Sequence, residues 1–239
     1  MKKRIWELDF LRGVCILGVV IVHLIYDLVD LHEIIDWEYP PLFEFIKNWG
    51  GIIFILLSGI CVTLGSRSVR RGLIVFACGM ICTVVTYGMY YFGLAGSIII
   101  IYFGVLHCLG ACMILWPLFK KFPWWLLLVI GVVLIAAGFY IDAKVRVDHL
   151  WLIPLGLHVP NFLTSDYFPL LPYLGFFLLG AVLGKTVYRK KETLLPKVNA
   201  GNPIVRFFLL CGKHSLWIYL LHQPVLNGIC YLILAFQNN

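Results

Sequence analysis

Four ionisable residues lie inside the first apolar segment of the chain, with a spacing that could support chemistry. At about 100° of rotation per residue, they fall within roughly 60° of one helix face. The four residues are Asp9, Arg12, His23 and Asp27. A charge at the bilayer centre costs at least ~2.5–3.5 kcal/mol, so this face is expected to look into protein or water.

The two ends of this polar face suggest different tasks. Asp9 and Arg12 are three residues apart and can form an ion pair, either as a simple anchor or as a cation that binds a phosphate. Asp27 follows His23 by four residues. A carboxylate at that distance can hold one imidazole nitrogen and leave the other as a proton acceptor. The alternative for His23 is a polar packing residue.

Further along the chain, five more polar residues interrupt apolar sequence. His107 has small neighbours that allow close helix approach, and is either a proton-handling group or an interhelical hydrogen-bond partner. Asp166 either caps a helix or places a carboxylate at the outer rim. Lys185 either snorkels from a helix end or binds an anion. His222 and Gln223 indicate a polar patch that faces a cavity.

Composition places the chain in the membrane class. It has 239 residues, of which 62% are apolar and 13% are charged, whereas soluble domains are about half apolar and a quarter charged. The formal net charge of +7 does not require a nucleic-acid partner, because cytoplasmic loops of membrane proteins are basic. The cysteine pairs Cys78/Cys82 and Cys108/Cys112 favour helix packing over metal binding, so we expect neither a metal site nor disulfides.

Apolar segments of about 18–20 residues predict an all-α polytopic helical bundle with seven spans. We expect one domain over 1–239, a short interfacial helix at 203–212 and an interfacial or re-entrant segment at 150–163. Gly175 and Gly180 are one residue too far apart for a Gly-x3-Gly pair. The predicted spans are 9–30, 43–65, 72–92, 97–118, 124–141, 169–188 and 214–236.

The distribution of Lys and Arg predicts the orientation of these spans. The N-terminus begins with Lys2, Lys3 and Arg4, and most other basic residues fall on the same side. The N-terminus is therefore expected in the cytoplasm and the C-terminus outside, as for an integral protein of the cytoplasmic membrane. The first outer loop is acidic.

Several motifs resemble bacterial and archaeal members of the heparan-α-glucosaminide N-acetyltransferase catalytic-domain family, over almost the whole chain. The spacing from Arg12 to His23 also resembles the Arg-x10-His signature of membrane acyltransferase family 3. The motifs are Leu8-Asp9-Phe10-Leu11-Arg12-Gly13 with His23 and Tyr26-Asp27, Phe103-Gly104-Val105-Leu106-His107, Asp166-Tyr167-Phe168-Pro169-Leu170-Leu171-Pro172, and His214-Ser215-Leu216 with Tyr219-Leu220 and His222-Gln223-Pro224.

The resemblance implies a membrane acyltransferase that moves an acetyl group from cytoplasmic acetyl-CoA to a sugar or glycolipid at the outer side. His23 would be the base and Asp27 would fix its tautomer, while His107 and Asp166 would orient the acceptor. The donor-binding set comprises Arg12, Asp9, Lys185 and His222.

Some alternatives stay open at this point. Eukaryotic members of the family carry Asn at the position of His23 and place their essential histidine in the first outer loop, so His107 and His32 remain candidates. A proton-coupled transporter or a non-catalytic membrane subunit would also use intramembrane His and Asp residues. The sequence does not distinguish a monomer from a homo-oligomer, or direct transfer from an acyl-histidine intermediate.

Overall fold

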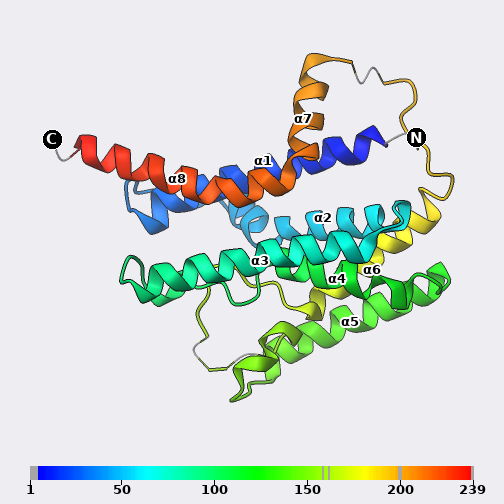
Figure 1. Cartoon of the computed structure of the whole chain (residues 1–239), viewed down its shortest axis with the longest axis horizontal. Coiled ribbons are helices and arrows are strands. Elements are labelled where there is room, and N and C mark those ends of the chain that lie inside the picture. Colours follow the sequence, from blue (N-terminus) through cyan, green and yellow to red (C-terminus); the bar gives the residue numbers. More distant parts are fainter. Residues whose placement is uncertain (1–4, 158, 161, 199–200, 238–239) are drawn as a thin grey trace. The chain divides into compact units, whose positions relative to one another are not determined.

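The computed structural model describes residues 5–157, 159–160, 162–198 and 201–237, and within these ranges the chain is helical without strands (Figure 1). Lys2, Lys3 and Arg4, on which the predicted orientation partly rests, lie outside the described residues. The helices are α1 (Trp6–Tyr26), the π-helical turn η1 (Asp27–Leu31), α2 (Pro41–Leu64), α3 (Ser68–Tyr91), the 3-10 turn η2 (Ser97–Ile99), α4 (Val105–Phe119), α5 (Trp124–Lys144), the 3-10 turn η3 (Leu150–Leu155), α6 (Leu170–Thr186), α7 (Pro203–Lys213) and α8 (Ser215–Gln237).

The all-helical membrane fold is confirmed in its main features. Five described helical segments are long and apolar enough to cross a bilayer, and they coincide with five of the seven predicted spans. The other two predicted spans correspond to the shorter apolar helices α4 and α6, so seven crossings remain a prediction. The helix predicted at 203–212 is α7, and the segment predicted at 150–163 contains η3.

Helix α4 begins at Val105, eight residues later than the predicted start at 97. The reason is a long-range contact that apolar periodicity cannot reveal. Residues 99–103 run beside 164–168, where Phe168 donates its N–H to the carbonyl of Phe103 at 2.9 Å. Thr164 and Ser165 donate their hydroxyls to the carbonyls of Ile100 and Ile99. These carbonyls are therefore satisfied outside a helix.

The chain divides into two compact units. The terminal unit comprises Met1–Phe54 and Glu192–Asn239, and the central unit comprises Ile55–Lys191. Helix α2 contributes its first part to the terminal unit and its second part to the central unit. The terminal unit contains α1, η1, α7 and α8, and the central unit contains α3 to α6.

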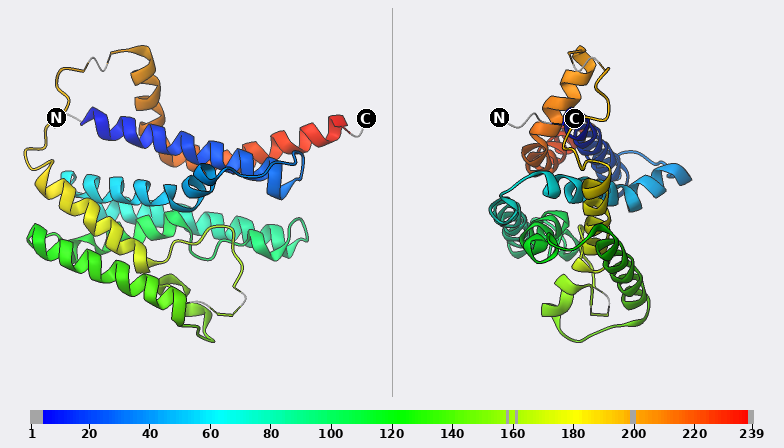
Figure 2. Two further views of the ribbon diagram at one scale, coloured as in Figure 1. Left: turned by 180° about the vertical axis from the view of Figure 1, so that it is seen from behind. Right: turned by 90° about the vertical axis from the view of Figure 1, so that its right-hand side faces the viewer.

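In the terminal unit, α1 lies beside α8 and is crossed by α7 (Figures 1 and 2). The crossing of α1 and α7 is close because two glycines face it. A Cβ atom on Gly13 would collide with the carbonyl of Phe208, and one on Gly212 would collide with the carbonyl of Asp9. Backbone therefore meets backbone at this crossing, as is common between membrane helices.

Glu7 fixes the chain that leads into α7. This carboxylate is 5% exposed and accepts hydrogen bonds from the Thr193 hydroxyl at 2.8 Å and the Leu194 N–H at 2.7 Å. A buried carboxylate is tolerated when it accepts such bonds. Glu7 thus attaches the segment after the central unit to the first turn of α1.

In the central unit, α3 packs on α4 and α5 packs on α6 (Figures 1 and 2). Gly175 and Gly180 both lie in α6, but they serve different neighbours. Gly175 faces the carbonyl of Gly131 in α5, whereas a Cβ on Gly180 would collide with the carbonyl of Leu56 in α2. The Gly-x3-Gly pair of α6 is Gly180 and Gly184, and Gly184 likewise faces α2, at Thr63.

Substituting Gly180 with Leu should destabilise the central unit by at least about 1–3 kcal/mol, because the side chain has no space beside α2. Gly88→Leu is the matched control, since a Cβ at Gly88 meets no atom within 4 Å. Thermal unfolding of the purified variants in detergent measures both effects. Equal melting temperatures for the two variants would contradict this account of the crossing.

Candidate functional site

Two histidines from opposite ends of the sequence meet in the terminal unit. The rings of His23 in α1 and His222 in α8 lie 4.9 Å apart between centroids, edge to face at 63°. His23 is partly buried and His222 is buried. His222, expected in the donor-binding set, therefore lies beside the residue expected to act as the base.

The backbone fixes the tautomer of His222. Its Nδ1 lies 2.5 Å from the carbonyl oxygen of Tyr219, one turn earlier in α8. A carbonyl only accepts, so Nδ1 carries the proton in the neutral ring and Nε2 carries the lone pair. Nε2 is buried and has no hydrogen-bond partner among the described residues. It is therefore available to accept a proton from another molecule.

Asp27 contacts Gln223 rather than the expected His23. It is fully buried, and its Oδ1 accepts a hydrogen bond from Gln223 Nε2 at 2.9 Å. Asp27 keeps α-helical backbone angles and donates its N–H to the carbonyl of His23, and the π-helical turn that starts at Asp27 ends at Leu31. Such turns alter the direction of side chains and are frequent at functional sites. Sequence spacing did not identify Gln223 as the partner.

Three buried polar atoms of the terminal unit have no protein partner among the described residues. Buried polar groups normally form hydrogen bonds, and an unsatisfied one costs about 1–3 kcal/mol. Among the described residues, the side-chain atoms left unsatisfied are Asp27 Oδ2, His222 Nε2 and Gln223 Oε1. All three come from the terminal unit. A ligand or water that supplies hydrogen bonds would remove this penalty.

His32 lies in the same unit and is held by α8. Its Nε2 is 3.0 Å from Asn227 Oδ1, and Asn227 Nδ2 donates to the carbonyl of Gln223. Asn227 is thus the acceptor, and the His32 proton is on Nε2. The ring also contacts Tyr231. His32 is separated from the His23 pair by one turn of α8, which carries Gln223.

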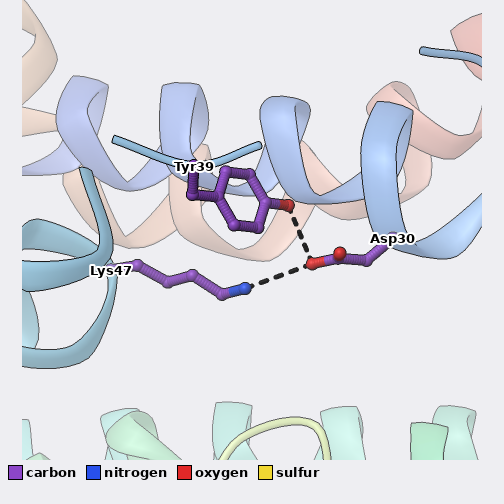
Figure 3. A network of polar contacts seen from close by, with 3 residues as sticks. All are labelled: Asp30, Tyr39 and Lys47. Carbon is purple, nitrogen blue, oxygen red and sulfur yellow. Dashed lines mark hydrogen bonds and ion pairs between the residues drawn. The ribbon is translucent and has the colours of Figure 1, made fainter. Parts of the chain in front are cut away.

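The acidic first loop folds back on the start of α2. Asp30 Oδ2 accepts from the Tyr39 hydroxyl at 2.8 Å and from Lys47 Nζ at 3.1 Å, as Figure 3 shows. The Lys47 ammonium also lies over the rings of Tyr26 and Tyr39. Burial raises the pKa of Tyr39, and the hydrogen bond and charge of Asp30 add to this effect. Tyr39 therefore remains a hydrogen-bond donor at neutral pH.

Arg12 and Asp9 form the ion pair that their spacing suggests, with Nη1 and Oδ1 3.0 Å apart. Asp9 is buried and Arg12 retains partial exposure. The close crossing at Gly212 holds the backbone of Asp9. The guanidinium is therefore oriented near one end of α1, about 16 Å along the helix from His23.

His107 is in the central unit, and both of its ring nitrogens are engaged. Nδ1 accepts the N–H of Gly104 at 3.2 Å, and Nε2 lies 3.3 Å from the hydroxyl of Thr83, which donates to the carbonyl of Ile101. Gly79 leaves room for the ring, since a Cβ there would lie 2.9 Å from Nδ1. This geometry favours the interhelical hydrogen-bond partner over the proton-handling group.

Asp166 contacts the same helix start. Its Oδ2 accepts the N–H of Val105 at 3.1 Å, so the carboxylate caps α4 rather than the α6 helix that follows it in sequence. Gly104 has no side chain to collide with this carboxylate. His107 and Asp166 therefore both form hydrogen bonds to backbone N–H groups at the start of α4.

Lys185 lies at the opposite end of α4. Its Nζ donates to the carbonyl oxygens of Lys120 at 2.8 Å and Phe122 at 2.5 Å, and it lies 5.8 Å from the ring centre of Trp116. The ammonium thus links the end of α6 to the end of α4. The eight sequence-predicted site residues fall into three groups. The terminal unit contains Asp9, Arg12, His23, Asp27 and His222. The start of α4 has His107 and Asp166, and the end of α4 has Lys185.

Replacing Asp166 with Ala should destabilise the protein by about 1–2 kcal/mol, the usual cost of a lost helix cap. Asp148 lies exposed in the same loop, so Asp148→Ala should change the melting temperature little. Thermal unfolding compares the two. If Asp166→Ala abolished activity and left the melting temperature unchanged, Asp166 would have a chemical role instead.

Comparison with known families agrees with these motifs. The family described as "Heparan-alpha-glucosaminide N-acetyltransferase, catalytic" matches residues 4–224. No curated protein and no solved structure matches the chain. The family that the sequence motifs indicated is confirmed. This helical protein belongs to the heparan-alpha-glucosaminide N-acetyltransferase catalytic family.

Proposed function

We propose that the protein transfers an acetyl group from acetyl-CoA to a hydroxyl or amine of a glycan or glycolipid. Membership of the family supports acetyl transfer in a membrane. The observation that carries the proposal is the contact of His23 with His222, together with the three buried polar atoms of the same unit that have no partner among the described residues. These atoms provide both a proton acceptor and hydrogen-bonding groups for a substrate.

The donor would bind along α1. Arg12 is oriented by Asp9, and its planar guanidinium is well suited to the phosphates of CoA. The flexible pantetheine arm of CoA joins those phosphates to the thioester. A donor that lies along the helix from Arg12 would therefore present its thioester near His23, with the donor entering from the cytoplasmic side.

The histidine pair would supply the base. The proton of the acceptor passes to an imidazole nitrogen, and the acceptor oxygen or nitrogen attacks the thioester carbonyl. The C–S bond then breaks, and the CoA thiolate leaves and takes up the proton. His222 Nε2 is the better-defined base because the Tyr219 carbonyl fixes its lone pair, and His23 would hold the reacting groups against it. Asp27 would stabilise the imidazolium through its charge.

The acceptor would approach the end of α1 that lies opposite Arg12. His32 and the loop from 32 to 40 lie at this end, with the Asp30–Tyr39–Lys47 network on its α2 side. Carboxylates, amides and aromatic faces are the groups that bind sugar hydroxyls and C–H surfaces. The acceptor side is proposed to be the outer face of the membrane.

The direct test is an assay of the purified full chain in detergent, with acetyl-CoA and glucosamine as substrates. Release of free CoA thiol together with acetylated glucosamine supports the proposal. Hydrolysis without acceptor turnover would support the donor assignment and exclude glucosamine as the acceptor. Absence of both binding and turnover of acetyl-CoA would refute the proposed activity.

Substituting either histidine of the pair with Ala should lower kcat by about 10²-fold or more, as loss of a general base does, with little change in the KM for acetyl-CoA. His214→Ala is the matched control, because His214 is exposed at the junction of α7 and α8. Steady-state kinetics separate the three variants. Unchanged kcat in both His23→Ala and His222→Ala would exclude this pair from the chemistry.

Asp27→Asn should keep the fold and lower turnover by roughly 10²-fold, because an amide oxygen still accepts from Gln223 while the charge is lost. Asp27→Ala should in addition destabilise the protein by about 1–3 kcal/mol, since the buried Gln223 amide loses its acceptor. Kinetics and thermal unfolding of both variants provide the comparison. A large change in acetyl-CoA affinity for Asp27→Asn would instead place Asp27 in the donor site.

A further inference from the structure

A cleft lined by cations opens at the end of the central unit where α2, α4 and α6 finish. Its volume is about 520 Å³, within the range of ligand pockets. Five lining residues are basic and none is acidic. We call this the basic cleft, and its lining residues are Val62, Thr63, Gly65, Trp116, Lys120, Lys121, Gly184, Lys185, Tyr188, Arg189 and Lys191.

One of these cations is held in place by the fold. The Lys185 ammonium donates to two backbone carbonyls at the end of α4 and faces the ring of Trp116. Gly184 lets α6 approach α2 closely, since a Cβ there would collide with the Thr63 hydroxyl. The charge of Lys185 is therefore fixed beside the junction of the three helices.

The other cations come from separate segments of the chain. Lys120 and Lys121 follow α4, whereas Arg189 and Lys191 follow α6, and all four are exposed. A further guanidinium, that of Arg71, lies against Gly65 at the edge, where a Cβ would be 2.6 Å from its Nη2. Like charges gathered without an acidic partner repel one another, and a bound anion would offset this repulsion.

The aromatic residues of the cleft do not offer a stacking face. Trp116 and Tyr188 are 6% and 7% exposed, and the Trp116 ring contacts Phe177 and the Lys185 ammonium. A nucleotide base commonly stacks on an exposed aromatic ring. The exposed chemistry of the cleft is cationic, which favours a phosphate over a nucleoside.

Exposed apolar side chains occur at the ends of α4 and α6 that form the basic cleft, and at the start of α5, which follows α4 in the chain. Leu118 precedes the lysines of α4, Leu183 and Val187 accompany Lys185, and Trp124 and Trp125 open α5, all at least 42% exposed. Paired tryptophans at a helix end are typical of the headgroup level of a bilayer. A ligand here can place a phosphate among the cations and acyl chains on the apolar surface.

We propose that the basic cleft binds the headgroup phosphate of an anionic glycerophospholipid. Basic pockets between helix ends recognise such headgroups through charge and hydrogen bonds. The lipid would hold together the ends of α2, α4 and α6. This site is separate from the proposed acetyl transfer, and it requires no contact with the histidine pair.

The test uses the purified full chain in dodecylmaltoside, with dioleoylphosphatidylglycerol and dioleoylphosphatidylcholine as probes and native mass spectrometry as the readout. The cleft variant Lys120→Gln/Lys191→Gln removes two charges and leaves the Lys120 carbonyl for Lys185. The control Lys144→Gln/Arg146→Gln removes two charges, one from the last residue of α5 and one from the loop after it. Melting temperatures without lipid establish that both variants are folded.

Wild type and the control should prefer phosphatidylglycerol over phosphatidylcholine. The cleft variant should bind phosphatidylglycerol about 25-fold more weakly, from roughly fivefold for each charge. Equal binding of the two lipids by wild type, or an equal loss in both variants, would overturn the proposal. Competitive displacement of phosphatidylglycerol by free CoA would also overturn it, and would assign the cleft to the donor. Acetyl transfer measured without added lipid tests the proposed function independently.

Discussion

Contact between helix backbones at glycine is the constraint on which both units depend. Lipid provides no hydrophobic drive for apolar helices to associate, so their attraction comes from close packing and polar contacts. Gly13 and Gly212 bring α1 and α7 together in the terminal unit, and Gly180 brings α6 against α2 in the central unit. These approaches fix the depth and rotation of the helices. Polar side chains on these helices are therefore positioned by helix packing rather than by loops.

The two histidine clusters show how hydrogen bonding separates a structural residue from a reactive one. His107 uses both ring nitrogens, one toward the Gly104 N–H and one toward Thr83, so protonation of its acceptor nitrogen would break a contact that starts α4. His222 uses only Nδ1 and leaves the lone pair of Nε2 buried without a partner. Both lie in apolar helices, and burial alone does not distinguish them. The difference is whether protein groups form hydrogen bonds to both ring nitrogens or to only one of them.

The sequence predicted the elements of the fold better than the contacts among them. Runs of apolar residues located every long helix, and helical spacing predicted the Asp9–Arg12 pair, since both signals are local. The start of α4, the cap supplied by Asp166 and the Asp27–Gln223 hydrogen bond depend on segments 61 to 196 residues apart. The role of Glu7 is not predictable from the sequence, because its partners Thr193 and Leu194 lie in a loop without a recognisable motif.

The π-helical turn at Asp27–Leu31 follows directly on α1 and separates this helix from the loop that begins at His32. A regular helix couples the direction of every side chain to the residue count before it, so that one insertion or deletion turns everything beyond it by about 100°. The wider turn at Asp27–Leu31 absorbs such a change locally. Arg12 and His23 precede it, Asp30 lies within it, and the loop to Tyr39 follows it. Over evolutionary time, the loop beyond the turn could therefore change its length and its binding preference while the register that aligns the histidines with α8 stays the same.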